Sequence, residues 1–381
     1  MIPRTVFEED HEILRRSVRE FLLEEAVPHN DRWEEQGQVD RKIWLQAGEM
    51  GLLCPDLPED LGGLGLDFRA NAVVNEEIWR LGLSGIGWPL HSDIAAPYIT
   101  RYGTDEAKAE YLPGCVSGEI ITALGLTEPG AGSDLQGIST TAVEDGDHFV
   151  LNGSKTFITN GQLSDLVVLA AKTDPAAGAK GISVFLVETA SDGFTKGTNL
   201  KKVGMKAQDT SEQFLVDVRV PKRNLLGQLN AGFGYLMSEL AQERISVALG
   251  AVAGAEAVLE QTVAYVQERK AFGKTIAAFQ NTQFKLAEMD TDISLARTFL
   301  DRCLELLVAG KLDAATAAKA KLSATEVYHR VCDECVQLFG GYGYMWEYPV
   351  ARAWADSRVQ RIYAGSNEVM KLIIGRDLLK G

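Results

Sequence analysis

The residues of this chain that could do chemistry begin with a glycine-rich loop. The block 126–134 (LTEPGAGSD) follows an apolar run and packs glycines, a proline and hydroxyls into one turn. Small residues let backbone N–H groups approach a ligand, and Thr127 and Ser133 add hydroxyl donors beside them. The block lacks the Gly-x-Gly-x-x-Gly spacing of a dinucleotide-binding unit, which disfavours a nicotinamide site. A purely structural turn also explains it.

A second segment, 152–161 (NGSKTFITNG), has the pattern of a strand between two Asn-Gly turns. The period of two along a strand places Phe157 and Thr159 on one face. An aromatic ring beside a hydroxyl suits a flat heterocycle. An ordinary cross-strand pair explains the same two residues equally well.

A third group of residues lies at helix ends in the C-terminal part. The block 268–274 (ERKAFGK) ends one helix with cations, which favourably oppose the negative end of its dipole. Gln280 opens the next helix, and 337–343 (QLFGGYG) ends another. Amides and glycines near a basic residue could hold a pyrophosphate and a ribityl chain, although capping alone accounts for the cations.

The elements that must position these residues follow from apolar periodicity. Helical spacing extends from about residue 8 to 115, short apolar runs bounded by turn signals occupy 120–225, and long Ala- and Leu-rich segments follow. We expect strands at 148–151, 166–171, 182–187 and 214–220, and late helices at 232–268, 280–309, 313–340 and 367–379. This order predicts an α+β fold with an N-terminal helical domain (1–119), a central antiparallel β domain (120–228) and a C-terminal four-helix bundle (229–381).

Composition narrows the classes of partner. The 381 residues are 46% hydrophobic and carry a net charge of −15, so a large core is expected, and the overall field repels nucleic acid and anionic lipid. No stretch of eighteen uninterrupted apolar residues or secretory signal is apparent, so we expect no membrane insertion. The five cysteines are scattered, which favours free thiols and a cytoplasmic location. Cys332 and Cys335 share a helix face without a second ligand pair, so we expect no metal.

Taken together, the blocks resemble the acyl-CoA dehydrogenase family, and the resemblance covers essentially the whole chain. The segments 126–134, 153–161 and 269–274 and the tail 362–368 (IYAGSNE) occur in the family's order and spacing. The segments 205–210 (MKAQDT), 242–244 (QER) and 343–349 (GYMWEYP) look closest to the long-chain branch.

The resemblance implies a reaction and its partners. The reaction is FAD-dependent α,β-desaturation of an acyl-CoA thioester to the trans-2-enoyl-CoA. The implied partners are the acyl-CoA substrate and an electron-transfer flavoprotein that accepts the electrons, and the implied assembly is a homotetramer, a dimer of dimers. The implied pathway is fatty acid β-oxidation. Two alternatives stay open: a flavin oxidase or monooxygenase on the same fold, and a non-catalytic homologue that binds acyl-CoA and FAD.

The resemblance also assigns the residues that bind cofactor and substrate. Around the flavin it places Leu126, Thr127, Gly132, Ser133, Phe157 and Thr159. Toward the FAD of a neighbouring subunit it places Arg269, Phe272, Gln280, Gln337 and Gly341. The tail adds Ser366 and Glu368 for the cofactor. The substrate-binding residues are Ser133, Arg244, Tyr363 and Gly365.

The chain departs from the commonest family pattern at the catalytic base. Many members carry a glutamate directly after the tyrosine that matches Tyr363, and here that position is Ala364. The long-chain branch instead places the base in a Glu-Arg pair on a C-terminal helix, which makes Glu243 the expected base, with Arg244 along the coenzyme A tail. For an arbitrary helix glutamate, a solvated ion pair would be the default. The backbone N–H of Ala364 keeps the oxyanion contact that the family's tail residue makes, because a backbone donor survives a side-chain change.

Overall fold

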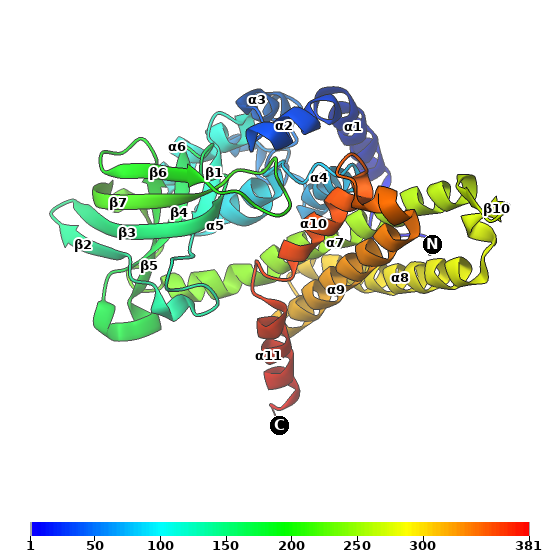
Figure 1. The fold of residues 1–381 in the computed structure, drawn as a ribbon. Helices are drawn as coiled ribbons and strands as arrows, with labels where there is room; N and C mark the ends of the chain where they lie inside the picture. Colours follow the sequence, from blue (N-terminus) through cyan, green and yellow to red (C-terminus); the bar gives the residue numbers. More distant parts are fainter. Residues whose placement is uncertain (1, 381) are drawn as a thin grey trace.

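The computed structural model describes residues 2–380, and its elements fall into consecutive groups along the chain (Figure 1). Helices α1 to α6 come first, strands β1 to β8 follow, and helices α7 to α11 complete the chain. The sheet lies at one end of the molecule and the long helices at the other (Figure 1). This is the α+β architecture that the periodicity predicts.

The helices are α1 (Glu9–Glu25), α2 (Asn30–Gln36), α3 (Arg41–Glu49), α4 (Phe68–Arg80), α5 (Ala96–Tyr102), α6 (Asp105–Ser117), α7 (Gly232–Glu268), α8 (Gln280–Val308), α9 (Ala314–Phe339), α10 (Pro349–Gln360) and α11 (Asn367–Leu378). The strands of the sheet are β1 (Thr122–Gly125), β2 (Thr141–Asp145), β3 (His148–Thr159), β4 (Leu166–Lys172), β5 (Ile182–Glu188), β6 (Phe194–Asn199), β7 (Thr210–Pro221) and β8 (Leu225–Leu226). A separate hairpin pairs β9 (Lys270–Ala271) with β10 (Lys274–Thr275).

The sheet has the order β6-β7-β3-β2-β4-β5-β8, and β1 pairs with β4. Most neighbours are antiparallel, as expected, while β1 and β2 run parallel to β4. The turn predicted at Asn152-Gly153 is wrong, because β3 continues through both residues with a shift in its register. Glycine is needed at 153 for another reason: an added Cβ would lie 2.4 Å from Oγ1 of Thr140.

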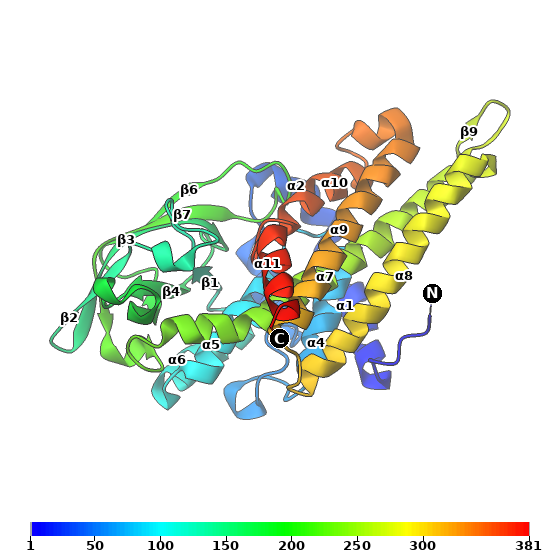
Figure 2. The same cartoon turned by 90° about the horizontal axis from the view of Figure 1, so that it is seen from below.

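Helix α7 is the central element of the helical part. It begins beside the sheet and ends at the β9–β10 hairpin (Figure 2), and it packs against α4, α8 and α9 in one apolar core. By length and composition α7 could cross a membrane, but 72% of its most apolar window is buried inside the protein. Its hydrophobicity is therefore that of a core helix.

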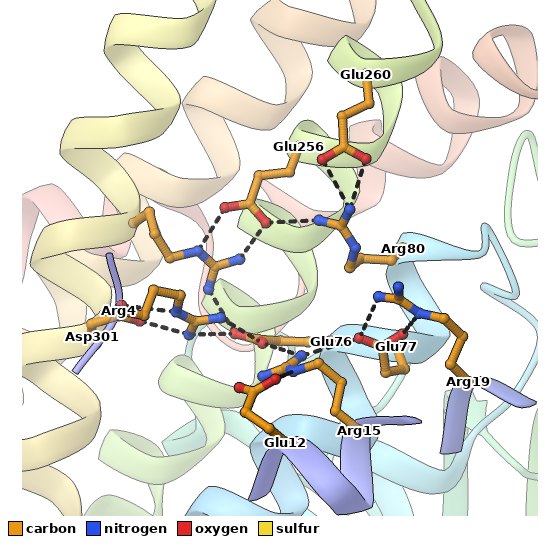
Figure 3. Close-up of polar contacts among 11 residues, drawn as sticks. Arg4, Glu12, Arg15, Arg19, Glu76, Glu77, Arg80, Glu256, Glu260 and Asp301 are labelled. Atoms are coloured by element: carbon orange, nitrogen blue, oxygen red, sulfur yellow. Dashed lines mark hydrogen bonds and ion pairs between the residues drawn. The ribbon is translucent and has the colours of Figure 1, made fainter. Parts of the chain in front are cut away.

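A buried ion-pair network joins the N-terminal helices to the bundle (Figure 3). Glu76 on α4 accepts from Arg297 of α8 at 2.6 Å, from Arg4 at 2.9 Å and from Arg15 of α1 at 2.9 Å. Arg297 also donates to Glu256 of α7 at 2.8 Å. Burial alone would raise the pKa of Glu76, but the surrounding guanidinium charges outweigh it and hold that pKa well below its usual range. The network thereby fixes the position of α7 relative to α4.

Candidate active site

Glu243 lies in the first half of α7, where the helix faces α5. The side chain is only 5% exposed, so it is not the solvated ion pair that is the default for a helix glutamate. The hydroxyl of Tyr98 donates to its Oε1 at 3.0 Å. Burial raises the pKa of Glu243 to about 7, opposed by the Tyr98 hydrogen bond and reinforced by the nearby charge of Glu239. A carboxylate with that pKa is poised to accept a proton near neutral pH.

Arg244, the next residue, is a buried cation without a carboxylate partner among residues 2–380. Its Nη1 donates to the carbonyl of Ala314 at 3.4 Å, and its Nε has no partner. Burial lowers the pKa of Arg244. Its Nη2 also has no partner among the described residues and, unlike the Nε, is not fully enclosed. This nitrogen suits a polar group of a ligand that arrives from outside the chain.

The tail between α10 and α11 forms a tight turn that presents a backbone donor. Ala364 has φ 51° and Gly365 has φ 86°, so both residues lie in the left-handed region. Lys321 of α9 anchors this turn by donating to the carbonyl of Gly365 and to Oδ1 of Asn367, each at 2.9 Å. Within the described residues the N–H of Ala364 has no acceptor. It is therefore available to a ligand.

Lys321 is a site residue that the sequence reasoning missed. It is fully buried, and burial followed by the charge of Arg244 lowers its pKa to about 8. Two cations, Lys321 and Arg244, therefore lie close to each other near the tail turn. A lysine in the middle of an alanine-rich helix gave no local signal of this role, because its partners lie more than forty residues away, with separations of 44 and 46 positions.

The glycine-rich loop 126–134 is held against β3 by a buried carboxylate. Glu128 accepts from Lys155 at 2.7 Å, from the N–H of Ser139 at 2.6 Å and from the N–H of Thr140 at 3.1 Å. Burial would raise the pKa of Glu128, but the charge of Lys155 outweighs it and lowers that pKa to about 2. The N–H of Thr156 also donates to the carbonyl of Thr127 at 2.9 Å. Loop and strand therefore form one surface.

This surface fits a flat, partly apolar cofactor such as the flavin of FAD. Phe157 on β3 is 68% exposed and has φ 58°, a strained backbone that directs an aromatic ring into open space. A Cβ added at Gly132 would meet no atom within 4 Å. Ser133 is exposed and Thr159 is half-buried, so hydroxyls and an open backbone flank the aromatic face.

The second predicted set of cofactor residues gathers at the opposite end of α7. Arg269 lies over the ring of Tyr342 with 5.5 Å between its Cζ and the ring centroid, so the end of α7 meets the segment after α9. Phe272, in the hairpin, is 94% exposed. Gln280 begins α8, while Gln337 lies in the last turn of α9, and Gly341 follows that helix. Figures 1 and 2 both place the hairpin far from the sheet, so the chain itself does not bring this set to the 126–134 loop.

Each part of the chain matches a known family. Models described as the N-terminal, middle and C-terminal domains of acyl-CoA dehydrogenase match residues 8–119, 123–218 and 230–379. The chain is 50% identical over 378 residues to the mitochondrial long-chain specific acyl-CoA dehydrogenase of Sus scrofa, covering 99% of this chain and 88% of the relative.

Solved structures of acyl-CoA dehydrogenases have the same fold as this chain. An acyl-CoA dehydrogenase from Geobacillus kaustophilus superposes with a TM-score of 0.97 at 50% identity, covering 99% of this chain and 100% of that one. An acyl-CoA dehydrogenase complexed with FAD from Bacillus anthracis gives a TM-score of 0.93 at 33% identity, covering 98% of this chain and 67% of that one.

Proposed function

This chain belongs to the acyl-CoA dehydrogenase family, and we propose that it desaturates an acyl-CoA thioester with FAD as the electron acceptor and Glu243 as the catalytic base. The observation that carries the proposal is the burial of Glu243 on α7, with its pKa raised to about 7, in a chain whose tail has Ala364 where many relatives carry a glutamate. The base can come from the tail position or from the helix of the C-terminal domain. In this chain the tail position is Ala364, and only the helix position, Glu243, is a carboxylate.

The proposed reaction divides the work among the residues described. The α carbon loses its hydrogen as a proton to the carboxylate of Glu243, and the electrons of that C–H bond form the new double bond. The β carbon loses its hydrogen together with the bonding pair. FAD, when bound, supplies the acceptor for that hydride. The charge that develops on the thioester oxygen is stabilised by the N–H of Ala364, a donor already fixed in the tail turn.

The proposed substrate contacts come from the family resemblance. Arg244 lies along the coenzyme A tail, while Ser133, Tyr363 and Gly365 line the thioester side. Burial of Glu243 raises its pKa and so keeps the carboxylate basic until substrate arrives.

The cofactor is proposed to bind between subunits. The residues of the 126–134 loop and β3 contact the flavin ring, and Ser366 and Glu368 contact the cofactor from the tail. The hairpin set of one subunit, Arg269 and Phe272 foremost, reaches the FAD of another. The separation of the two sets within one chain and the near-complete exposure of Phe272 support this arrangement. Such a shared site needs at least two subunits. From the family resemblance we propose a homotetramer, a dimer of dimers, which sedimentation of the FAD-bound protein tests.

The proposed partners and compartment complete this picture. Electrons leave the enzyme through an electron-transfer flavoprotein, and the pathway is fatty acid β-oxidation. We propose a cytoplasmic location from the free thiols, although the Sus scrofa relative is named as mitochondrial. Cell fractionation with an antibody against the chain distinguishes the two compartments.

Anaerobic titration of the purified yellow protein tests the function. Short, medium, long and branched acyl-CoAs are added in turn while flavin absorbance is followed. The proposal predicts bleaching by a subset of these thioesters, slow reoxidation in air and fast reoxidation by an electron-transfer flavoprotein. Absence of bleaching by every thioester contradicts the proposal, and rapid reoxidation in air identifies an oxidase.

A further inference from the structure

The carboxylate of Glu243 is held by a single neutral donor. Only the hydroxyl of Tyr98 lies within hydrogen-bond distance of it among residues 2–380, and it contacts Oε1. The other oxygen, Oε2, has no such partner. It is also not fully enclosed, in contrast to the orphaned amide oxygens of Asn71 and Asn75 nearby on α4. One oxygen of the carboxylate is therefore fixed, and the other is open to a ligand.

Tyr98 is itself fixed by the helix that carries it. It is fully buried in α5, which directly follows the π-helical turn Leu90–Ala95. The same helix holds the preceding turn of α7: Arg101 pairs with Glu239 and donates to Gln242 at 2.7 Å. Tyr102 adds a hydrogen bond to Glu239 at 2.8 Å. The face of α5 therefore sets the position of the α7 turn that bears Glu243.

The charged and titratable groups near Glu243 come from α7, from α5 and from the π-helical turn. On α7, the charge of Glu239 raises the pKa of Glu243, and the charge of Arg244 lowers it. From α5, Arg101 neutralises Glu239 by a direct ion pair. From the π-helical turn, the carbonyl of Asp93 accepts from Gln242 at 2.7 Å, and burial raises the pKa of Asp93 to about 7.

A cation in place of Tyr98 would lower the pKa of the carboxyl by roughly 1 to 3 units and make it a poor base. A phenol positions the carboxylate at a smaller cost in basicity. Burial keeps the pKa of the Tyr98 hydroxyl well above its usual value, so it remains a donor throughout the neutral range.

We propose that Tyr98 is a positioning residue for the desaturation, holding Oε1 of Glu243 so that Oε2 is directed at the α hydrogen of the substrate. The proposal rests on the proposed role of Glu243 as the base. It assigns a function to a tyrosine that lies 145 positions from its partner.

The experiment compares Tyr98→Phe with the parent enzyme in anaerobic stopped-flow reduction of the flavin by saturating acyl-CoA from pH 5 to 9. Loss of a hydrogen bond to a charged carboxylate should raise the midpoint of the acid limb by about one pH unit. Loss of alignment should lower the plateau rate about tenfold. Tyr111→Phe is the matched control, because Tyr111 is also buried and its hydroxyl contacts Glu188 at 2.8 Å, away from the site. The control should retain the parent profile.

Two further variants keep the test decisive. 3-Fluorotyrosine at position 98 preserves the shape of the side chain but is a stronger donor, so the acid limb should shift to lower pH. This variant decides the matter if Tyr98→Phe does not fold. Glu243→Gln tests the base itself, and its flavin content and acyl-CoA affinity are measured as well as its rate.

The outcomes separate the two ideas. Opposite shifts of the acid limb in the phenylalanine and fluorotyrosine enzymes support the positioning role. If Glu243→Gln loses flavin reduction while both Tyr98 variants keep the parent midpoint, the positioning role is wrong and the base stands. If Glu243→Gln reduces the flavin at the parent rate, the base assignment and the role of Tyr98 both fail.

Discussion

Replacing Glu243 by glutamine should make the folded protein more stable at neutral pH. In the native structure this carboxyl has a pKa of about 7. In the unfolded chain, where water surrounds it, its pKa is the ordinary 4.5. Between those values the folded state binds more protons than the unfolded state, so stability falls as the pH rises through this window. Glutamine is neutral, fills nearly the same volume and can still accept from Tyr98. The substitution therefore removes the destabilisation.

The size of the effect follows from the shift. A difference of about 2.5 units corresponds to about 3 kcal/mol in the free energy of unfolding, reached in full above about pH 7. Near pH 4.5 both side chains are largely neutral, and the difference should nearly vanish. For a chain of 381 residues, an unfolding entropy of roughly 0.8 kcal/mol/K converts 3 kcal/mol to a rise in Tm of about 4 °C.

The assay is thermal unfolding of the FAD-bound protein followed by flavin fluorescence from pH 5 to 8.5. Glu288→Gln is the control, because Glu288 is exposed on α8, and its Tm should follow that of the parent at each pH. A Glu243→Gln protein whose Tm equals or falls below that of the parent at pH 8 would contradict this prediction. A gain that does not change with pH would refute it as well.

Three further substitutions probe the supports of the site. Glu76→Gln leaves Arg297 buried beside a neutral amide, so we expect a loss of about 3 to 5 kcal/mol in unfolding free energy. Denaturant unfolding measures this loss, and a value below about 1 kcal/mol contradicts the prediction. Lys155→Met removes the ion pair of Glu128 and should weaken FAD binding about tenfold. Fluorescence titration of the apoprotein measures this, and an unchanged affinity means that the loop keeps its shape without the ion pair. Lys321→Met should slow flavin reduction about tenfold with acyl-CoA affinity retained, and an unchanged stopped-flow rate removes its anchoring role.

Local sequence patterns were enough to predict the main architecture. The predicted helix 232–268 coincides with α7, and the strand predicted at 182–187 differs from β5 by one residue. Long Ala- and Leu-rich periodicity and a short β-branched run are strong signals for these elements. Helix α10 was not predicted, although Pro349 at its first position and the apolar residues Val350, Ala351 and Ala355 after it gave a usable signal.

The turn predicted at Asn152-Gly153 failed for a physical reason. The same dipeptide suits a turn and a close approach between strands, and only the presence of Thr140 against Gly153 distinguishes them. A contact between neighbouring strands cannot be read from one strand alone.

The candidate site depended more on resemblance than on pattern. The sequence around Glu243 gives no sign that this glutamate is buried with a phenol while Glu239 is paired with Arg101, because both partners come from α5. Long-range packing decides which carboxylate stays basic. Lys321 was missed for the same reason, since its partners belong to the tail turn.

The most direct test of the central claim is single-turnover reduction of the flavin in Glu243→Gln under anaerobic conditions with an acyl-CoA that bleaches the parent. We expect retained FAD, retained acyl-CoA binding and a rate lower by about a thousandfold, because a positioned base contributes about that much. Flavin reduction at the parent rate would contradict it and place the base elsewhere in the chain.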